Sequence, residues 1–511
     1  MVTSRAAILL LAALVAGCAV QPSPMTNAEL AVTGQEWATR AVEDSERLSK
    51  PVSLYEAMAR ALKHNLDARV EELDAVLKLR QLDLASADQL PQLVADVNAT
   101  SRNNSDGSSS QSLLTGTQSL VSSTSTDRRV TTSDLNLSWN ILDFGLSYFR
   151  AHQAADRALI GAENRRKALH ALFRDVRTAF WRTAAADLLA RRMRSIGGRM
   201  QTATLHVQEL EEQGAVSPVF TLTYRREVLE LKVEIQRLYA ELAPAKIQLA
   251  HLMNVVPEPN FGVSGASNVS LQPFKLPSFD DMTDFALQGR PELRQAGYDK
   301  RINREEAQIA LLELLPGVAP FISANADTNS FLYNPNWISA GAKASWNLMK
   351  IAAYPQRKAA VEAEANYLDK KALATAIAIM AEVEVSRVNY LQAREKFRIA
   401  QEYYQVESAL YKQMASSHDA GAIGEHTLLR QEMRALLAEA KRNLAYADYQ
   451  NAFGILFVTM GFDIADGTVD AHLPLEILAG ALEADWRSQC KRASSMERRT
   501  NSSAILVRKS T

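Results

Sequence analysis

The sequence predicts a mainly helical fold with membrane β-strands, built from a unit that occurs twice in the chain. Three observations predict it: an export signal at the N-terminus, two segments that match each other at constant offsets, and alternating strands followed by a very long polar helix in each segment. The 511 residues include 57 basic and 58 acidic side chains, so no charge excess indicates a nucleic-acid partner.

Residues 1–17 are typical of a signal peptide. Arg5 supplies a positive charge, and residues 6–16 form an apolar run too short to span a bilayer. The run ends in Val15-Ala16-Gly17-Cys18, which resembles the lipobox of bacterial lipoproteins, so we expect Cys18 to be the acylated, palmitate-bearing mature N-terminus. An ordinary cleavage nearby, with Cys18 incidental, is the alternative. Ala19 after the cysteine favours sorting to the outer membrane.

Internal similarity at fixed offsets predicts a structural duplication. Leu90-Pro91 recurs as Leu315-Pro316, displaced by 225 positions, and Ser138-Trp139-Asn140 recurs as Ser345-Trp346-Asn347, displaced by 207. The change of offset falls in the Ser/Thr/Asn/Gly-rich residues 101–132, which we interpret as an exposed loop inserted in the first copy. Each copy then has the order helix, strand, loop, strand, very long helix, turn, helix.

Two strands are expected in each copy. Residues 134–141 and 338–348 alternate apolar and polar side chains, and the weaker strands at 93–100 and 322–327 do the same. This alternation is typical of outer-membrane barrels, with lipid on one side and water on the other, although a soluble sandwich strand alternates too. Four strands are too few to close a barrel, so several chains must contribute. The side chains predicted to face lipid are Leu135, Leu137, Trp139, Ala344 and Trp346.

The helices after the second strands are unusually long. Residues 147–213 and 355–418 each predict a helix of roughly 100 Å. The helix that returns from the first one carries a coiled-coil seam over residues 231–252, and Pro244 inside that seam is expected to kink it. A glycine follows each long helix, so each copy should form an antiparallel hairpin that projects far from the strands.

The duplicated phrases resemble the TolC family of outer-membrane efflux proteins. They are Ala61-Leu62-Lys63-His64-Asn65, the Leu-Pro and Ser-Trp-Asn repeats, and the Gly-Ala-Val/Ile turns, over about residues 53–463. With the lipobox, the chain resembles the lipidated branch of the family. The resemblance implies a homotrimer, in which a 12-stranded β-barrel continues into a long periplasmic α-helical barrel.

The resemblance also implies a function. The chain would be the outer-membrane channel of a tripartite export system, a passive duct for small molecules or metal ions that works with a periplasmic adaptor and an inner-membrane pump. Two alternatives remain open: the duct of a type I protein-secretion system, and a lipid-anchored coiled-coil scaffold without a pore. We expect no enzyme activity, no cofactor and no metal, because the sequence has no metal-type histidine pair and no phosphate-binding glycine loop.

Two groups of site residues follow from the resemblance. In the family the hairpin turns meet the adaptor tip to tip, and the turn residues here are Gly214, Ala215, Val216, Gly421, Ala422 and Ile423. Several members carry an acidic ring just beyond the second turn, at the periplasmic mouth. The candidates in this stretch are Glu425, His426 and Arg430, of which only Glu425 is acidic. A solvated turn histidine is the alternative reading of His426.

These observations divide the chain into seven segments. They are a signal peptide (1–17), a lipid-anchored N-terminal linker (18–52), a first structural repeat (53–256), an inter-repeat equatorial linker (257–277), a second repeat (278–463), a C-terminal equatorial segment (464–485) and a basic disordered tail (486–511).

Overall fold

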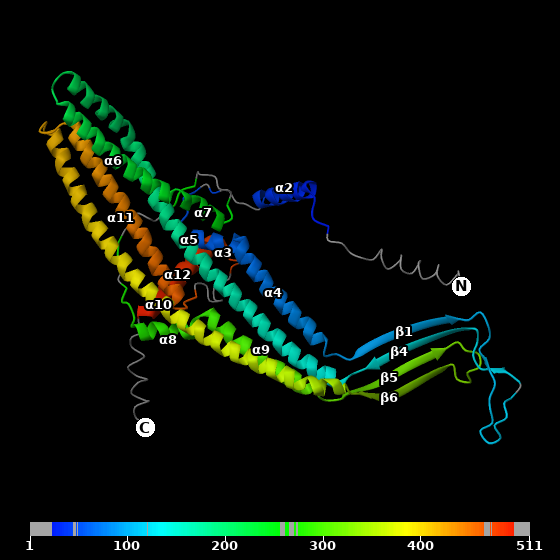
Figure 1. The fold of residues 1–511 in the computed structure, drawn as a ribbon. Coiled ribbons are helices and arrows are strands. Elements are labelled where there is room, and N and C mark those ends of the chain that lie inside the picture. The colour runs from blue at the N-terminus through cyan, green and yellow to red at the C-terminus, as the bar shows by residue number, and fades with distance from the viewer. Residues whose placement is uncertain are drawn as a thin grey trace, which may run out of the picture.

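The chain is an elongated molecule with a β-sheet at one end and two helical hairpins at the other (Figure 1). The computed structural model describes residues 23–43, 48, 50–119, 121–255, 261–264, 270–271, 274–463, 471 and 473–494. Cys18 and the signal peptide lie outside this set, so the lipid anchor remains a prediction. Within the described part of the chain, no helix is both long enough and apolar enough to cross a membrane.

The predicted duplication is present in the helices. Matched helices have equal lengths of 11, 22 and 72 residues in the two copies. The pairs are α3 (Leu54–His64) and α8 (Phe279–Gly289), α4 (Leu66–Ala87) and α9 (Pro291–Leu312), and α5 (Ile141–Glu212) and α10 (Leu348–Asp419). The returning helix is α11 (Glu425–Thr459) in the second copy, whereas in the first copy it is divided into α6 (Pro218–Leu242) and α7 (Pro244–Leu252). The break falls at Pro244, where the kink was predicted, because proline has no amide hydrogen to continue the helix.

The strands form one antiparallel sheet in the order β1-β4-β5-β6. They are β1 (Gln92–Ser101), β4 (Arg129–Ser138), β5 (Gly317–Asp327) and β6 (Asn336–Ser345). The register confirms the predicted faces, because Leu137 lies opposite Ile322 and Asn136 lies opposite Ser323. The loop inserted in the first copy is exposed, as expected. The loop nevertheless holds a small hairpin of β2 (Gly107–Ser108) and β3 (Ser123–Thr124). It is also shorter than predicted, because β4 begins at Arg129, within the range 101–132 predicted for the loop.

The strands end earlier, and the long helices begin earlier, than predicted. The sheet stops at Ser138 and Ser345, so the predicted strand ends at 141 and 348 are wrong. The physical reason is helix capping. The side-chain oxygen of Asn140 accepts a hydrogen bond from the amide of Leu142 at 3.0 Å, and Asn347 accepts one from Met349 at 3.1 Å. Pro355 consequently lies inside α10 and not in its first turn.

The helices continue the order of the strands. β1, β4, β5 and β6 adjoin α4, α5, α9 and α10, and these helices pack side by side in the same order. Nearer the turns the order is α6, α5, α11 and α10. The central helix α5 therefore buries large side chains such as Phe173, Val176 and Phe180, whereas α10 lies at an edge of the layer and exposes Leu373 and Ile377.

The segment predicted as a disordered tail begins with a helix, so this prediction is wrong up to Ser494. α12 (Leu475–Ser494) packs against α3 and buries Leu478, Leu482 and Trp486, which are spaced by four residues on one face. The indole of Trp486 lies 4.9 Å from the ring of Phe457, measured between centroids. At the other end of the chain, the predicted N-terminal linker contains the exposed helix α2 (Asn27–Glu43).

A cluster of polar side chains, the Asp463 joint, connects α5 with α12 and with the residues that follow α11. Asp463, just after α11, accepts hydrogen bonds from Arg166 and, at 2.6 Å, from Nε2 of His170. Gln489 of α12 donates to its backbone carbonyl. Burial alone would raise the pKa of Asp463, but the hydrogen bonds from His170 and Arg166 outweigh burial and hold this pKa below its ordinary value.

Candidate docking turns and channel wall

The two hairpin turns have the same backbone conformation. Gly214 and Gly421 adopt φ angles of +71° and +73°, in the left-handed region that glycine enters without a steric penalty. In each turn the amide of the following alanine, Ala215 or Ala422, donates to the carbonyl five residues earlier, at 2.8 and 2.9 Å respectively. This is the Schellman termination of a helix, so both glycines have a structural role in addition to any docking role.

The turn residues differ in exposure. Ala215 and Ala422 are exposed, whereas Val216 and Ile423 are half-buried. Both turns lie at the same end of the molecule, at the maximum distance from the sheet (Figure 1). The matched pairs therefore present a small apolar surface at the tip of each hairpin.

The three candidates for the periplasmic mouth do not form one cluster. Arg430 Nη1 pairs with Glu227 Oε2 of α6 at 3.0 Å. His426 packs edge-on against Phe220 and Tyr224, with ring centroids 5.6 and 5.9 Å away, so it is not a solvated turn histidine. Burial, together with the nearby Arg430 charge, lowers the pKa of His426. Glu425 alone remains exposed.

The inner strand β4 presents its two predicted faces unequally to solvent, because Leu135 and Leu137 are exposed whereas Asn136 and Ser138 are half-buried. On the edge strand β6, Ala344 is exposed, and so are its polar neighbours Lys343 and Ser345. Exposed aliphatic side chains on one face of a sheet are typical of a surface that meets lipid or protein.

The two tryptophans predicted to face lipid lie just beyond the strands and not within them. Trp139 Nε1 donates to the carbonyl of Gln89 at 3.2 Å, and Trp346 Nε1 donates to that of Leu314 at 2.9 Å. Each hydrogen bond links the residue just after one strand to a residue shortly before another strand. Each indole ring is partly exposed. Aromatic residues at this level are typical of the interfacial girdle of a membrane barrel.

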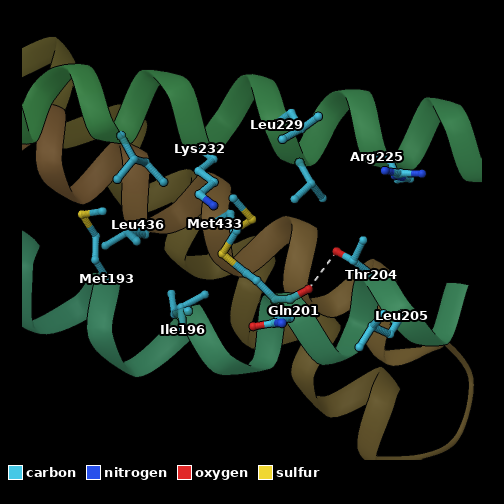
Figure 2. A pocket seen from close by; sticks show the side chains of 14 residues that line it. Met193, Ile196, Gln201, Thr204, Leu205, Arg225, Leu229, Lys232, Met433 and Leu436 are labelled. Atoms are coloured by element: carbon cyan, nitrogen blue, oxygen red, sulfur yellow. Dashed lines mark hydrogen bonds between the residues drawn. The ribbon is translucent and has the colours of Figure 1, made fainter. Parts of the chain in front are cut away.

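A groove of about 380 Å³ lies between α5 and α6, with α11 as its floor (Figure 2). Three methionines line it, Met193 and Met200 from α5 and Met433 from α11. Gly197 leaves the space open, because a Cβ there would have no neighbour within 4 Å. Methionine side chains adapt readily to different contacts, so this stretch of the first hairpin is a deformable surface.

Three residues that shape the site were not predicted from the sequence. Gly424 precedes α11, and a Cβ on it would lie 2.7 Å from the His426 ring, so glycine lets that ring fold back. Asn140 and Asn347 belong to the repeated Ser-Trp-Asn phrase, but their role as helix caps was not predicted. Their position just before a long polar helix was the available signal.

No group of three or more His, Cys, Asp or Glu side chains with metal-binding geometry occurs among the described residues. The features that distinguish the site are therefore apolar turns, an exposed sheet face and long helical hairpins. Together with the duplicated order of elements, they define the architecture of an outer-membrane channel.

Comparison with solved structures agrees with this class. The chain is similar to the Campylobacter jejuni CmeC outer membrane channel, with 16% identity and a TM-score of 0.61 over 85% of this chain and 90% of that one. It is similar to the open state of the Neisseria gonorrhoeae MtrE outer membrane channel, with 16% identity and a TM-score of 0.59 over 80% and 88%. The outer membrane protein VceC of Vibrio cholerae matches with 12% identity and a TM-score of 0.60 over 80% and 96%.

Neither a protein-family model nor a curated protein sequence matches the chain. The similarity is therefore one of structure. The chain has the fold of the TolC-like outer-membrane channels, and this confirms the predicted fold class.

Proposed function

We propose that the chain is the outer-membrane channel of a tripartite export system. Three copies would form a passive duct for small molecules or metal ions, anchored at Cys18 and joined to an inner-membrane pump through a periplasmic adaptor. The observation that carries the proposal is a single layer of strands and helices that is open at both edges, in a chain with the fold of outer-membrane channels.

The sheet edges support closure by further copies. Among the described residues, β1 and β6 each pair on one side only, so each leaves a row of backbone groups without a strand partner there. Such an edge is unfavourable in lipid, where no water replaces the missing hydrogen bonds. Pairing β6 of one copy with β1 of the next satisfies both edges, and repetition closes a ring.

The helical edges support the same arrangement. α4 exposes an apolar seam at Leu66, Val70, Leu73 and Leu77, spaced by four and three residues, and Leu84 continues it one heptad beyond Leu77. This is the pattern of a coiled coil, and in the described part of the chain the seam is exposed. The opposite edge, α10, also exposes large apolar side chains, including Leu373, Ile377 and Leu391. Side-by-side packing of α4 and α10 from neighbouring copies would bury both.

The test of channel formation is direct. We expect the purified full-length protein to run as a heat-sensitive oligomer on a gel and to give single-channel conductance in planar bilayers. A scaffold without a pore would form the oligomer but give no conductance. The type I secretion alternative is separated by the cargo, because an efflux duct restores small-molecule or metal resistance to a deletion strain without restoring secretion of a protein.

The turns are the proposed adaptor contact. We expect Val216→Glu combined with Ile423→Glu to leave assembly and conductance intact and to abolish export, because each adds a charge to an apolar contact that loses water on docking. Adaptor pulldown and an export assay measure the effect. The control is Gln405→Glu, which adds a charge on the exposed surface of α10 about four turns from its end. Normal adaptor capture and export by the double variant would refute tip-to-tip docking.

A further inference from the structure

A second cavity lies within one chain, away from the hairpin turns, where α3, α5, α11 and α12 meet. Its volume is about 980 Å³, and aromatic side chains form part of its wall. The aromatic lining residues are Tyr55, Phe180, Trp181, Tyr446, Phe453 and Trp486. The charged side chains Glu476, Glu483, Arg487 and Lys491 also line it, all from α12. None of these residues belongs to the proposed channel wall or docking turns.

Arg177 of α5 lines this cavity as a buried cation. Its relative exposure is 2%, and its guanidinium makes one hydrogen bond, from Nη2 to Oε1 of Gln450 at 3.2 Å. Nε and Nη1 are buried and have no hydrogen-bond partner in the described part of the chain. Among the residues that the structure describes, no carboxylate pairs with it.

The fold makes room for this arginine. The guanidinium stacks on the indole of Trp486, with its central carbon 4.4 Å from the ring centroid. A Cβ on Gly454 of α11 would lie only 2.8 Å from Arg177 Nε, so glycine at this position lets the side chain pass along the helix. Stacking accounts for one face of the guanidinium, but it supplies no acceptor for the in-plane N–H groups of Nε and Nη1.

A third donor lines the same cavity. Nε1 of Trp181 is buried and also lacks a hydrogen-bond partner. Burial of a cation without a counter-charge is strongly unfavourable, and burial lowers the pKa of Arg177. An anionic group in the cavity would supply acceptors and a counter-charge at once, and the planar guanidinium is well suited to carboxylate oxygens.

We propose that this cavity binds a small organic carboxylate whose apolar body lies against the aromatic wall. Arg177 receives the carboxylate, Trp181 donates a further hydrogen bond, and Trp486 holds the guanidinium in place from its other face. The aromatic lining favours an anion with an apolar body over inorganic phosphate, whose whole surface is polar. The site lies within one chain, so it does not depend on the proposed channel function.

Cys490 supplies a natural reporter. It lines the same cavity, and burial raises the pKa of its thiol to about 11, against a weaker opposing effect of Arg177. The thiol is therefore protonated and slow to react at neutral pH. A bound carboxylate should shield it further.

The binding test uses the full-length protein in detergent, with benzoate as the probe and neutral benzamide as its isostere. In equilibrium dialysis we expect saturable benzoate binding that benzamide does not displace. Arg177→Gln should weaken binding by about tenfold or more, and Trp181→Phe, which removes only the N–H donor, by about fivefold. Arg174→Gln, which removes an exposed arginine of the same helix that does not line the cavity, is the matched control and should bind within about twofold of the parent protein.

The outcomes separate the proposal from a purely structural role of Arg177. Benzoate should also slow modification of Cys490 by a small neutral thiol reagent. If Arg177→Gln does not assemble, Trp181→Phe and Cys490 protection decide. Absence of saturable benzoate binding at about 10 mM, or equal binding by the parent protein and Trp181→Phe together with unprotected Cys490, overturns the proposal.

Discussion

Single polar residues determine where the elements of this chain begin and meet. Asn140 and Asn347 end the strands by capping the long helices, and Trp139 and Trp346 tie the neighbouring segments together just before those caps. Each of these pairs is related by the offset of 207 positions that the sequence repeats. The repeated Ser-Trp-Asn phrase is thus a junction between sheet and helix, with a separate hydrogen bond for the tryptophan and for the asparagine.

The Asp463 joint makes stability depend on pH. The pKa of Asp463 in the folded chain lies below its ordinary value of 3.8, so its contribution is fully present above pH 3.8 and is lost as the pH falls through the lowered pKa. We expect Asp463→Asn to destabilise the chain by about 1–3 kcal/mol at neutral pH, because His170 and Arg166 lose their charged acceptor.

The measurement is thermal unfolding of the two proteins between pH 7 and pH 3. The difference in stability should shrink as the pH approaches the lowered pKa of Asp463. An equal difference at every pH would contradict the assignment. Asp485→Asn is the control for loss of one negative charge in the same region, because the Asp485 carboxylate accepts a hydrogen bond from Gln489 but does not contact His170 or Arg166.

Cys18 carries the second residue-scale prediction. If residues 15–18 form a lipobox, Cys18→Ala should abolish acylation and leave uncleaved or mislocalised precursor. Mass spectrometry of the mature N-terminus reads this out, with Cys490→Ala as the control that keeps the anchor. An unmodified N-terminus downstream of Cys18 in the parent protein would contradict the prediction.

At the scale of elements, equal length does not give equal surroundings. α5 and α10 both have 72 residues, yet α5 is packed between neighbours and buries many more side chains than α10. The difference follows from position in the layer, since α5 is interior and α10 forms an edge. The apolar residues exposed on α10 are therefore better explained by an absent neighbour than by the solvent preference of that helix.

The strand β4 allows a matched test of the membrane wall. Leu137→Arg should cost about 2–4 kcal/mol if its position lies near the bilayer midplane, whereas Ser138→Arg, on the polar face, should cost much less. Cysteine scanning of residues 135–138 with a water-soluble reagent tests the same alternation. Equal labelling of both faces in the membrane would contradict the assignment of lipid and water faces.

At the scale of the whole molecule, both edges of the layer are open among the described residues, which is why we propose that further copies complete it. Strand order and helix order coincide from the sheet into the helices, so one lateral contact with the next copy would close the strands and the helices together. A ring built in this way has an interior along its whole length. This is the geometric basis of the proposed duct.

The α4 seam provides the test of that contact. Leu77 and Leu79 have the same relative exposure, 52%, in the single chain, but only Leu77 belongs to the apolar seam. We expect Leu77→Glu to weaken the oligomer, because it buries a charge between copies, and Leu79→Glu to leave the oligomer largely intact. Heat sensitivity of the oligomer on a gel measures both. Equal effects of the two variants would place the contact elsewhere on α4.

The sequence by itself determined the duplication, the alternating strands, the long hairpins and the glycine turns. Each of these features is a local or periodic pattern, recorded in the spacing of residues along the chain. The errors at the strand ends have the same origin, because the alternating pattern of Leu135, Leu137 and Trp139 runs past the point where the cap at Asn140 starts a helix.

Only the tertiary structure decided the contacts between distant segments. His170 meets Asp463 across 293 positions and Arg177 meets Gln450 across 273, and no periodicity in the sequence predicts either pair. The C-terminal half of α12, residues 486–494, was predicted as part of a basic tail because of its basic side chains. Trp486 is nevertheless buried, between Phe457 of α11 and the guanidinium of Arg177 on α5. Whether a side chain is buried depends on the residues that pack against it. In the folded chain these residues come from elements far apart in the sequence.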